Sequence, residues 1–260
     1  MPSQTLALRL AGPLQAWGTQ SQFNRRATDD RPSKAGIVGL LAAAAGRRRG
    51  EDVTDLLALT LGVRVDQPGV PLADYHTVST LDSGPLPSAN VNAKGWQVPT
   101  SPKKLTHVTR RDYLQDAVFV ACVGGDEELL AALAQAVTHP RFPLALGRRG
   151  CPPTQPLLIP HETGVLWPLS VGEALRAIPW QAGWAVRADR RLGASVTVSA
   201  TVDDNGDSDD LDVVADVPVS FDQRRRGYTS RRVRHFWVTL ATGLEPSTRT
   251  EHDPFTLLGW

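Results

Sequence analysis

The sequence has few cysteines and no apolar run long enough to cross a bilayer. Its two cysteines, Cys122 and Cys151, are too few for a disulfide framework and lack the spacing of a metal site. Each is expected to be a small buried apolar side chain. The longest apolar run, residues 35–46, is too short for a membrane span, and the first apolar stretch, 6–11, does not resemble a secretory signal. These absences predict a cytoplasmic protein with no membrane partner.

Lysine is also scarce, with 4 residues against 24 arginines. Sixteen of the arginines fall into seven runs, at residues 25–26, 47–49, 110–111, 148–149, 190–191, 224–226 and 231–232. A GC-rich genome explains the excess of arginine over lysine, but it does not explain the clustering. Because guanidinium groups pair with phosphate oxygens and stack on bases, the runs favour contact with nucleic acid over a merely solvated surface.

The formal net charge of +1 hides an uneven distribution. The stretch 203–212 holds six aspartates and no basic residue, so the rest of the chain carries 28 basic and 21 acidic residues, or +7. This stretch lacks the register of a calcium-binding EF-hand loop and is expected to be an exposed acidic loop. The remaining surface has the charge to attract a polyanion.

The first 160 residues alternate between strand and helix patterns. Strands are predicted at 5–10, 63–66, 74–80 and 117–123, and helices at 34–45, 55–61 and from Asp126 to His139. Residues 81–106 form a long proline-containing excursion without apolar period. The order is close to the βαββαβ pattern of a ferredoxin-like α+β fold. Residues 161–260 are expected to form a smaller β-rich region, with strands at 183–188, 195–202, 212–217 and 233–241.

Two short glycine-containing motifs are candidates for contact with a nucleic acid. Gly147-Arg148-Arg149-Gly150 places two guanidinium forks between glycines, whose amides are able to cradle a phosphate. Its spacing is neither that of a P-loop nor that of a Rossmann fingerprint. In the second motif, Gln15-Ala16-Trp17-Gly18, the tryptophan either stacks on a base or is wedged into the core.

Two basic segments extend this set. Arg110 and Arg111, followed by Tyr113, end the excursion at a place suited to gripping a strand. Residues 224–235 are the densest basic stretch, and they fit either an RNA backbone or a protein partner.

An enzyme is the alternative to a binding protein. Metal-independent RNA cleavage needs a base, an acid and a cation near the scissile phosphate. The residue types that would suffice are present at Tyr75, His76, Lys103, Lys104 and His107. The sequence has no serine or cysteine triad signature and no metal-ligand spacing, so neither a metal nor a cofactor is expected.

Together these motifs resemble a known family. The segments are LALRLAGPLQAWG (6–18), RPSKAGIVGLLAAAAG (31–46), DYHTV (74–78), RRDYLQDAVFVACV (110–123) and ALGRRGCPPTQPL (145–157). In this order they are similar to the CasD family of the type I-E CRISPR complex Cascade, which is Cas family five of the RAMP superfamily. PVSFDQRRRGYTSRRV (218–233) matches more loosely, and the acidic loop has the character of an insertion.

The resemblance implies a fold, a function and partners. It implies a RAMP domain over 1–160, with a thumb arm inserted at about 81–111. It also implies a non-catalytic subunit that holds the single-stranded 5′ handle of the CRISPR RNA, caps the CasC backbone filament and touches the large CasA subunit. Target DNA is then contacted only through the complex. By position, the family's RNA-binding residues correspond to Gln15, Trp17, Gly18, Ser33, Lys34, Gly36, Arg110, Arg111, Gly147, Arg148 and Arg149.

Overall fold

The protein is built around one six-stranded antiparallel sheet. The computed structural model describes residues 3–19, 24–79, 89–94, 97–99, 106–189, 192–204, 206, 210–222 and 227–244. The strand order is β1 (Gln4–Ala11), β9 (Val118–Gly125), β4 (Thr60–Gln67), β10 (Ser195–Asp203), β12 (Gly227–Ala241) and β11 (Asp212–Ser220). Strand β9 is buried at seven of its eight positions, which agrees with the continuous apolar run expected of a central strand.

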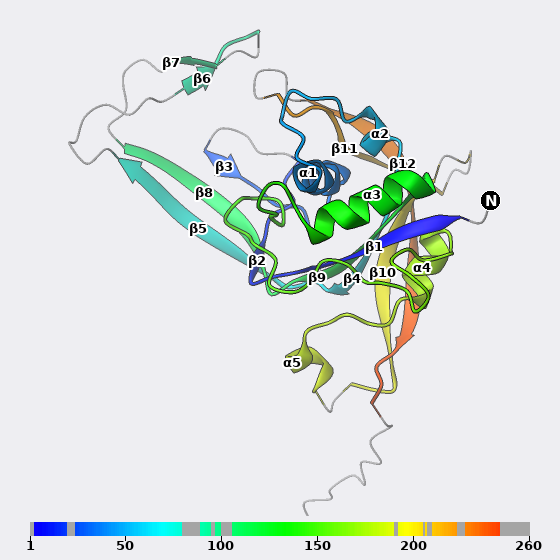
Figure 1. Ribbon diagram of the computed structural model, residues 1–260. Coiled ribbons are helices and arrows are strands. Elements are labelled where there is room, and N and C mark those ends of the chain that lie inside the picture. Colours follow the sequence, from blue (N-terminus) through cyan, green and yellow to red (C-terminus); the bar gives the residue numbers. More distant parts are fainter. Residues whose placement is uncertain are drawn as a thin grey trace, which may run out of the picture.

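Helices cover both faces of this sheet. In Figure 1, α1 (Lys34–Ala44) and α3 (Glu127–Thr138) lie above it, while α4 (Val171–Ala177) and α5 (Trp184–Arg187) lie below. A larger core joins α1 and α3 to β1, β4 and β9, and a smaller core packs α4 against the opposite face. The mixed α+β class expected from the sequence is therefore present. In the described part of the chain, no helix has the length and apolar character to span a bilayer.

A second, smaller sheet forms an arm. Its main ribbon pairs β5 (Val70–Ser79) with β8 (Thr106–Gln115), and β2 (Leu14–Gln15) and β3 (Arg25–Arg26) flank β8 near its root. Figure 1 shows the ribbon leaving the body, with the short hairpin β6 (Ala89–Val91) and β7 (Gln97–Pro99) beyond it. The expected excursion is thus framed by two ten-residue strands, and residues 80–88 and 100–105 lie outside the described residues.

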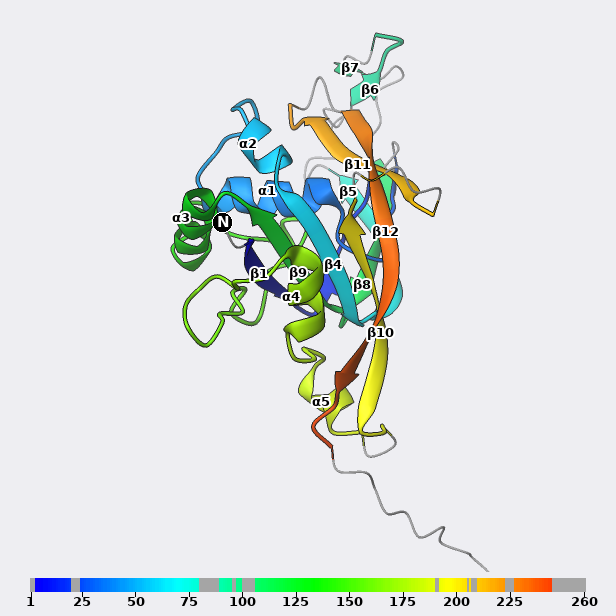
Figure 2. The same cartoon turned by 90° about the vertical axis from the view of Figure 1, so that its right-hand side faces the viewer.

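The C-terminal strands extend the main sheet through pairing of β10 with β4. Figure 2 shows β12 running along the molecule beside β10. Asp203, expected in an exposed acidic loop, ends β10 with its side chain only 11% exposed. It accepts hydrogen bonds from Lys34 Nζ at 2.9 Å and from Arg231. Arg231 also forms a two-pronged contact with Asp216, at 2.6 and 2.8 Å, so ionic contacts fix β10, β11 and β12 to α1.

A second buried ion pair fastens α4 to the sheet. Arg64 is fully buried and binds Asp66 through Nε and Nη2, at 2.6 and 2.9 Å. Its remaining donors reach the carbonyl groups of Leu175, Ile178 and Pro179 at the end of α4. Carbonyls left unpaired where a helix stops need donors, and this buried arginine supplies them to three carbonyls at and just beyond the end of α4.

Several sequence-based boundaries need correction. Residues 183–188, predicted as a strand, contain the short helix α5. The helix predicted at 55–61 is α2 (Thr54–Leu57), and the chain is already in strand β4 at Thr60. Helix α4 was missed, although Ser170 and Glu173 form the capping box that marks its start.

Candidate nucleic-acid interface

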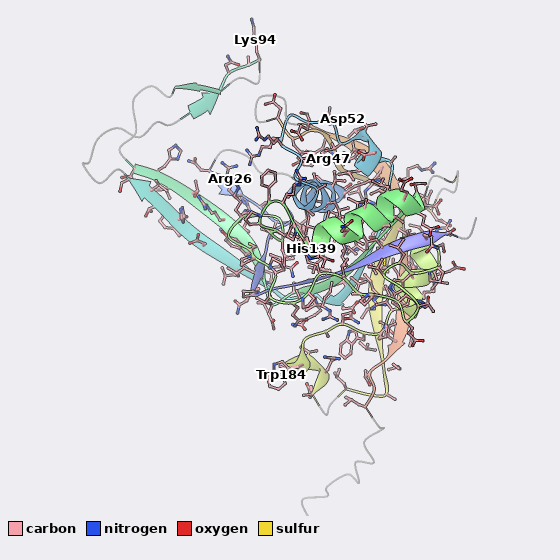
Figure 3. All side chains as sticks on the ribbon, in the orientation of Figure 1. Arg26, Arg47, Asp52, Lys94, His139 and Trp184 are labelled. Atoms are coloured by element: carbon pink, nitrogen blue, oxygen red, sulfur yellow. The ribbon has the colours of Figure 1, made fainter. Side chains whose placement is uncertain are left out.

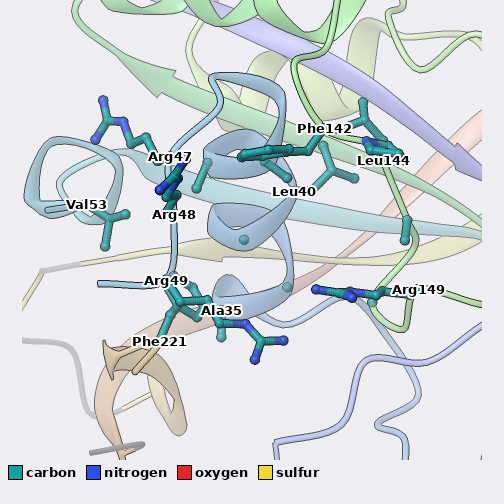
Figure 4. A pocket seen from close by; sticks show the side chains of 17 residues that line it. Ala35, Leu40, Arg47, Arg48, Arg49, Val53, Phe142, Leu144, Arg149 and Phe221 are labelled. Carbon is teal, nitrogen blue, oxygen red and sulfur yellow. The ribbon is translucent and has the colours of Figure 1, made fainter. Parts of the chain in front are cut away.

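An open groove with a basic rim runs over α1. Its volume is about 780 Å³, and the exposed side of α1 forms its floor with the small residues Ala35, Gly36, Gly39 and Ala43. Figure 4 shows Arg47, Arg48 and Arg49 gathered on one side of the helix, with Phe142, Leu144 and Arg149 on the other. Phe221, just after β11, completes the lining. The groove combines an apolar floor with cations at its edge.

The end of α1 determines where the arginine triplet lies. Gly46 has a φ of +80°, its N–H donates to Ala43 O at 3.1 Å, and the N–H of Arg47 donates to Ala42 O at 2.8 Å. This is a Schellman motif, which turns the chain sharply away from the helix axis. The following residues, 47–49, therefore lie beside the last turn of α1, where the helix dipole also favours cations.

The groove's charge is largely uncompensated. Arg47 is paired with Asp55 through two contacts of 2.5 Å, and this hydrogen-bonded guanidinium lowers the pKa of the Asp55 carboxyl. By contrast, Arg48, Arg49 and Arg149 are exposed and have no ion-pair partner within the described parts of the chain. Among the described residues that line the groove, none is acidic. Three guanidinium groups are thus available to an anion.

The glycine loop forms the opposite wall, and the amides of Leu146, Gly147 and Cys151 already donate to carbonyls of the loop itself. Gly147 has a φ of +86°, and a Cβ placed there would lie 1.7 Å from Ala16 O, so only glycine fits. Its N–H donates to Ala145 O at 3.0 Å, and Leu146 N donates to Cys151 O at 2.7 Å. The expectation that the Gly147 amide cradles a phosphate is therefore wrong. The glycine instead allows the loop to pack on residues 15–17.

The motif at residues 15–18 supports the groove from beneath. Trp17 is 1% exposed, and its ring lies so close to α1 that a Cβ on Gly36 would meet it at 2.6 Å. Gln15 is fully buried, accepts from Trp17 Nε1 at 3.0 Å and donates to Ala117 O at 2.7 Å. Neither side chain offers a surface to RNA, so the core alternative for Trp17 holds. Gly18 is partly exposed.

The start of α1 is likewise occupied by the protein itself. Ser33 caps the helix by accepting from Gly36 N at 3.2 Å, and the N–H of Lys34 donates to Asp216 at 2.8 Å. The Lys34 ammonium group is buried against Asp203 and the carbonyl of Leu59. The helix N-terminus does bind an anion, as its dipole favours. That anion is a carboxylate of the same chain, so the predicted phosphate contact at Ser33 and Lys34 is wrong.

Two arginine runs far apart in sequence lie side by side at the root of the arm. Strand β3 pairs with β8 in parallel, placing Arg25 beside Arg110 and Arg26 beside Arg111. Arg25 and Arg110 share Asp112 as ion-pair partner, at 3.9 and 3.1 Å, while Arg111 donates to Thr109 at 3.3 Å. Figure 3 shows Arg26 and Arg47 on the same side of the molecule. The arm root therefore adds to the positive charge near the groove.

Arg148 is more enclosed by the protein than Arg149. It donates to Asp112 O at 2.9 Å, to Ala27 O at 3.2 Å and to Arg26 O. Its guanidinium carbon lies 4.7 Å from the centre of the Tyr113 ring. Arg148 and Arg149 are adjacent in sequence but have different surroundings.

The catalytic candidates come together only in part, because the β5–β8 pairing sets His107 opposite Val78 and therefore on the same face of the arm as His76. Tyr75 and His76 are consecutive residues of β5, so their side chains point to opposite faces of the arm. His76 lies 3.5 Å from Asp74, and Lys103 and Lys104 lie outside the described residues. Among the residues that the structure describes, no group of three or more potential ligands is arranged to hold a metal ion. Burial raises the pKa of the Cys122 thiol to about 12 and also raises that of Cys151.

The structure thus unites only part of the predicted site. Arg149, Gly147 and Gly36 line one groove, and Arg110 and Arg111 lie at the arm root. The sequence shows residues 47–49 as a charged run, but the predicted RNA-binding site does not include them. The sequence features that point to residues 47–49 are the helix-ending Gly46 and the arginine run that directly follows it. Arginines 190–191 and 224–226 lie outside the described residues.

The chain is similar in sequence and in structure to known proteins of CRISPR systems. The family model described as "CRISPR-associated protein (Cas_Cas5)" matches residues 5–234. The Cascade subunit CasD of Escherichia coli (strain K12) is 34% identical over 171 residues, covering 59% of this chain and 69% of that protein. A solved structure titled "Crystal structure of Cas protein" has a TM-score of 0.62 at 34% identity, covering 90% of this chain and 94% of the other.

The second structural match is a component of an assembly. It comes from a "CRISPR RNA-guided surveillance complex" and has a TM-score of 0.71 at 33% identity, covering 98% of this chain and 100% of that chain. The family match spans most of the sequence and includes the groove, the arm and the glycine loop. The chain therefore belongs to the Cas5 family of CRISPR-associated proteins.

Proposed function

We propose that this protein is the RNA-binding Cas5 subunit of a type I-E CRISPR RNA-guided complex, and that it holds the single-stranded 5′ handle of the CRISPR RNA over α1. The groove carries this proposal. Its apolar floor suits the faces of unpaired bases, and Arg48, Arg49 and Arg149 at its rim suit the phosphates. Arg110, Arg111 and Gly18 would extend the contact toward the arm.

The fold supports a more specific assignment. The order β1, α1, β4, β9, α3 follows the first five elements of a ferredoxin-like βαββαβ domain. In place of a sixth element, residues 158 and 167 form isolated antiparallel bridges with Leu8 and Thr5 of β1. We assign the β5–β8 ribbon and residues 80–105 beyond it to the thumb of the RAMP group. The CasC filament and the large CasA subunit are the proposed protein partners.

The same proposal makes the subunit a binding protein without catalytic activity. Because Tyr75 and His76 lie on opposite faces of β5, one scissile phosphate cannot contact both. The alternative, a metal-independent endoribonuclease, would have to act without Tyr75, through His76 and His107 on the other face of the arm.

The test is the salt dependence of binding to a labelled single-stranded RNA with the repeat-derived 5′ sequence. Replacing Arg48, Arg49 and Arg149 together by Ala is expected to flatten the slope of log Kd against log salt by about 2, or about 0.7 per lost phosphate contact. Arg187→Ala is the matched control, because Arg187 is an exposed arginine of α5. Figure 3 shows α5, marked by Trp184, at the other end of the molecule.

An unchanged slope in the triple variant, or an equal effect of Arg187→Ala, contradicts the groove assignment. The same mixtures, incubated in EDTA, test catalysis. The RNA is expected to remain intact, and specific cutting that is lost in His76→Ala would instead support the endoribonuclease.

A further inference from the structure

Arg148 connects three separate segments of the protein. Nη1 donates to Asp112 O of β8, and Nη2 donates to the carbonyl groups of Arg26 and Ala27 at the end of β3. The guanidinium also lies over the ring of Tyr113, at 4.7 Å. One side chain of the glycine loop therefore holds both strands at the arm root.

The strand that Arg148 contacts is short. Strand β3 has two residues and pairs with β8 at two positions. Around it, Arg110 N donates to Asn24 O at 2.9 Å, Trp17 N donates to Thr28 Oγ1 at 2.8 Å, and Arg25 lies 3.9 Å from Asp112. A parallel strand pair this short is marginal by itself. The hydrogen bonds from Arg148 to the carbonyls of Arg26 and Ala27 therefore contribute much of the stability of β3.

These contacts leave Arg148 poorly placed to bind phosphate. Three of the hydrogen bonds its guanidinium can donate go to main-chain carbonyls, and one of its faces is covered by Tyr113. Arg149 makes no such contact with any described residue and opens into the groove. The two residues therefore have different roles.

We infer that Arg148 is a positioning residue, which fixes the glycine loop to the arm root so that the groove wall and the arm present one continuous surface to RNA. This inference rests on the proposed function, since it assigns a role within the same site. It replaces the expectation that Arg148 is itself a phosphate contact. Loss of Arg148 should loosen β3 and weaken RNA binding without removing a phosphate contact.

The experiment compares Arg148→Ala, Arg148→Lys and Arg149→Ala in RNA affinity, in salt slope and in hydrogen exchange of the RNA-free protein. Arg148→Ala is expected to raise Kd about tenfold, the equivalent of one hydrogen bond to a charged group, with the slope unchanged. Arg149→Ala is expected to reduce the slope by about 0.7. Arg148→Lys keeps the charge but loses the planar fork, so it should behave like Arg148→Ala.

Hydrogen exchange tests the coupling without RNA. In Arg148→Ala, amides of residues 24–27 and 106–113 should exchange faster, whereas Arg149→Ala should leave them unchanged. Tyr113→Leu should give a similar increase, and combining it with Arg148→Ala should add little, because both changes remove one shared contact.

Two results would overturn the inference. One is a reduced salt slope in Arg148→Ala that Arg148→Lys restores, which would make Arg148 a direct phosphate contact. The other is unchanged exchange at the arm root in Arg148→Ala. If the wild-type protein and all variants fail to bind RNA while exchange at the arm root still responds to Arg148, the proposed function fails and the coupling stands.

Discussion

The arginines within the main sheet and those around the groove differ in their burial and in whether an aspartate binds their guanidinium group. Arg64 and Arg231 are enclosed and each contacts at least one aspartate. Arg48, Arg49 and Arg149 are exposed and lack a carboxylate partner within the described chain. The same side chain thus holds the structure together in one region and remains available to a ligand in the other. What separates the roles is the presence of acidic residues on the same strand or on neighbouring strands.

The largest effect is expected from breaking the buried network. Arg231→Ala leaves Asp216 and Asp203 without their main partner, and removing one member of a buried ion pair typically costs about 3–5 kcal/mol in the free energy of unfolding. Urea denaturation measures this loss. Arg48→Ala is the control from the groove and should change the free energy by less than about 0.5 kcal/mol. Equal losses in the two variants would erase the distinction between the regions.

A smaller effect should come from the glycine loop, where Gly147 has a strict backbone requirement. Gly147→Ala places a methyl group against Ala16 O at a φ of +86°, so a loss of about 1–3 kcal/mol is expected. Gly150→Ala is the matched control, because a Cβ there meets nothing within 4 Å. Thermal denaturation of both variants checks the difference. A Gly147→Ala protein as stable as Gly150→Ala would show that the loop rearranges freely.

The smallest effect concerns the one groove arginine that does have a partner. Arg47 lowers the pKa of Asp55, so the pair stabilises the folded protein above the ordinary aspartate pKa. This contribution should disappear as the pH falls through the lowered pKa. Because both side chains are partly exposed, it is expected to be at most about 1 kcal/mol.

Asp55→Asn isolates that contribution. The variant should be slightly less stable than wild type at pH 7, and the gap between their melting temperatures should close toward pH 3. A gap that persists unchanged at pH 3 would mean that the charge of Asp55 does not contribute.

Local sequence signals located most of the elements that build the site. Ser33 and Gly46 correctly marked the ends of α1, Asp126 marked the start of α3, and the apolar run after Ala117 marked β9. Such signals depend on residues within one or two turns of each other, so they survive without knowledge of the fold. Helix α4, which the predicted elements omit, carries the same kind of signal in the capping box of Ser170 and Glu173.

The roles of individual side chains were harder to predict. Trp17, Lys34 and Arg148 have chemistry suited to RNA, yet their partners are Gly36, Asp203 and Tyr113. These partners lie 19, 169 and 35 residues away along the chain. No spacing rule connects these positions. Within the acidic stretch, Asp203 departs from the prediction for the same reason, because it meets its cationic partners only when β10 pairs with β4 and β12.

The sequence by itself determined the order of β1, α1, β4, β9 and α3, the positive character of the chain outside its acidic stretch, and the family to which it belongs, because each depends on composition or on local pattern. Only the tertiary structure decided which arginines face the groove and which are bound to aspartates. Burial and ion pairing are properties of neighbours in space, and here those neighbours are contributed by α1, the arm and C-terminal strands far apart in the chain.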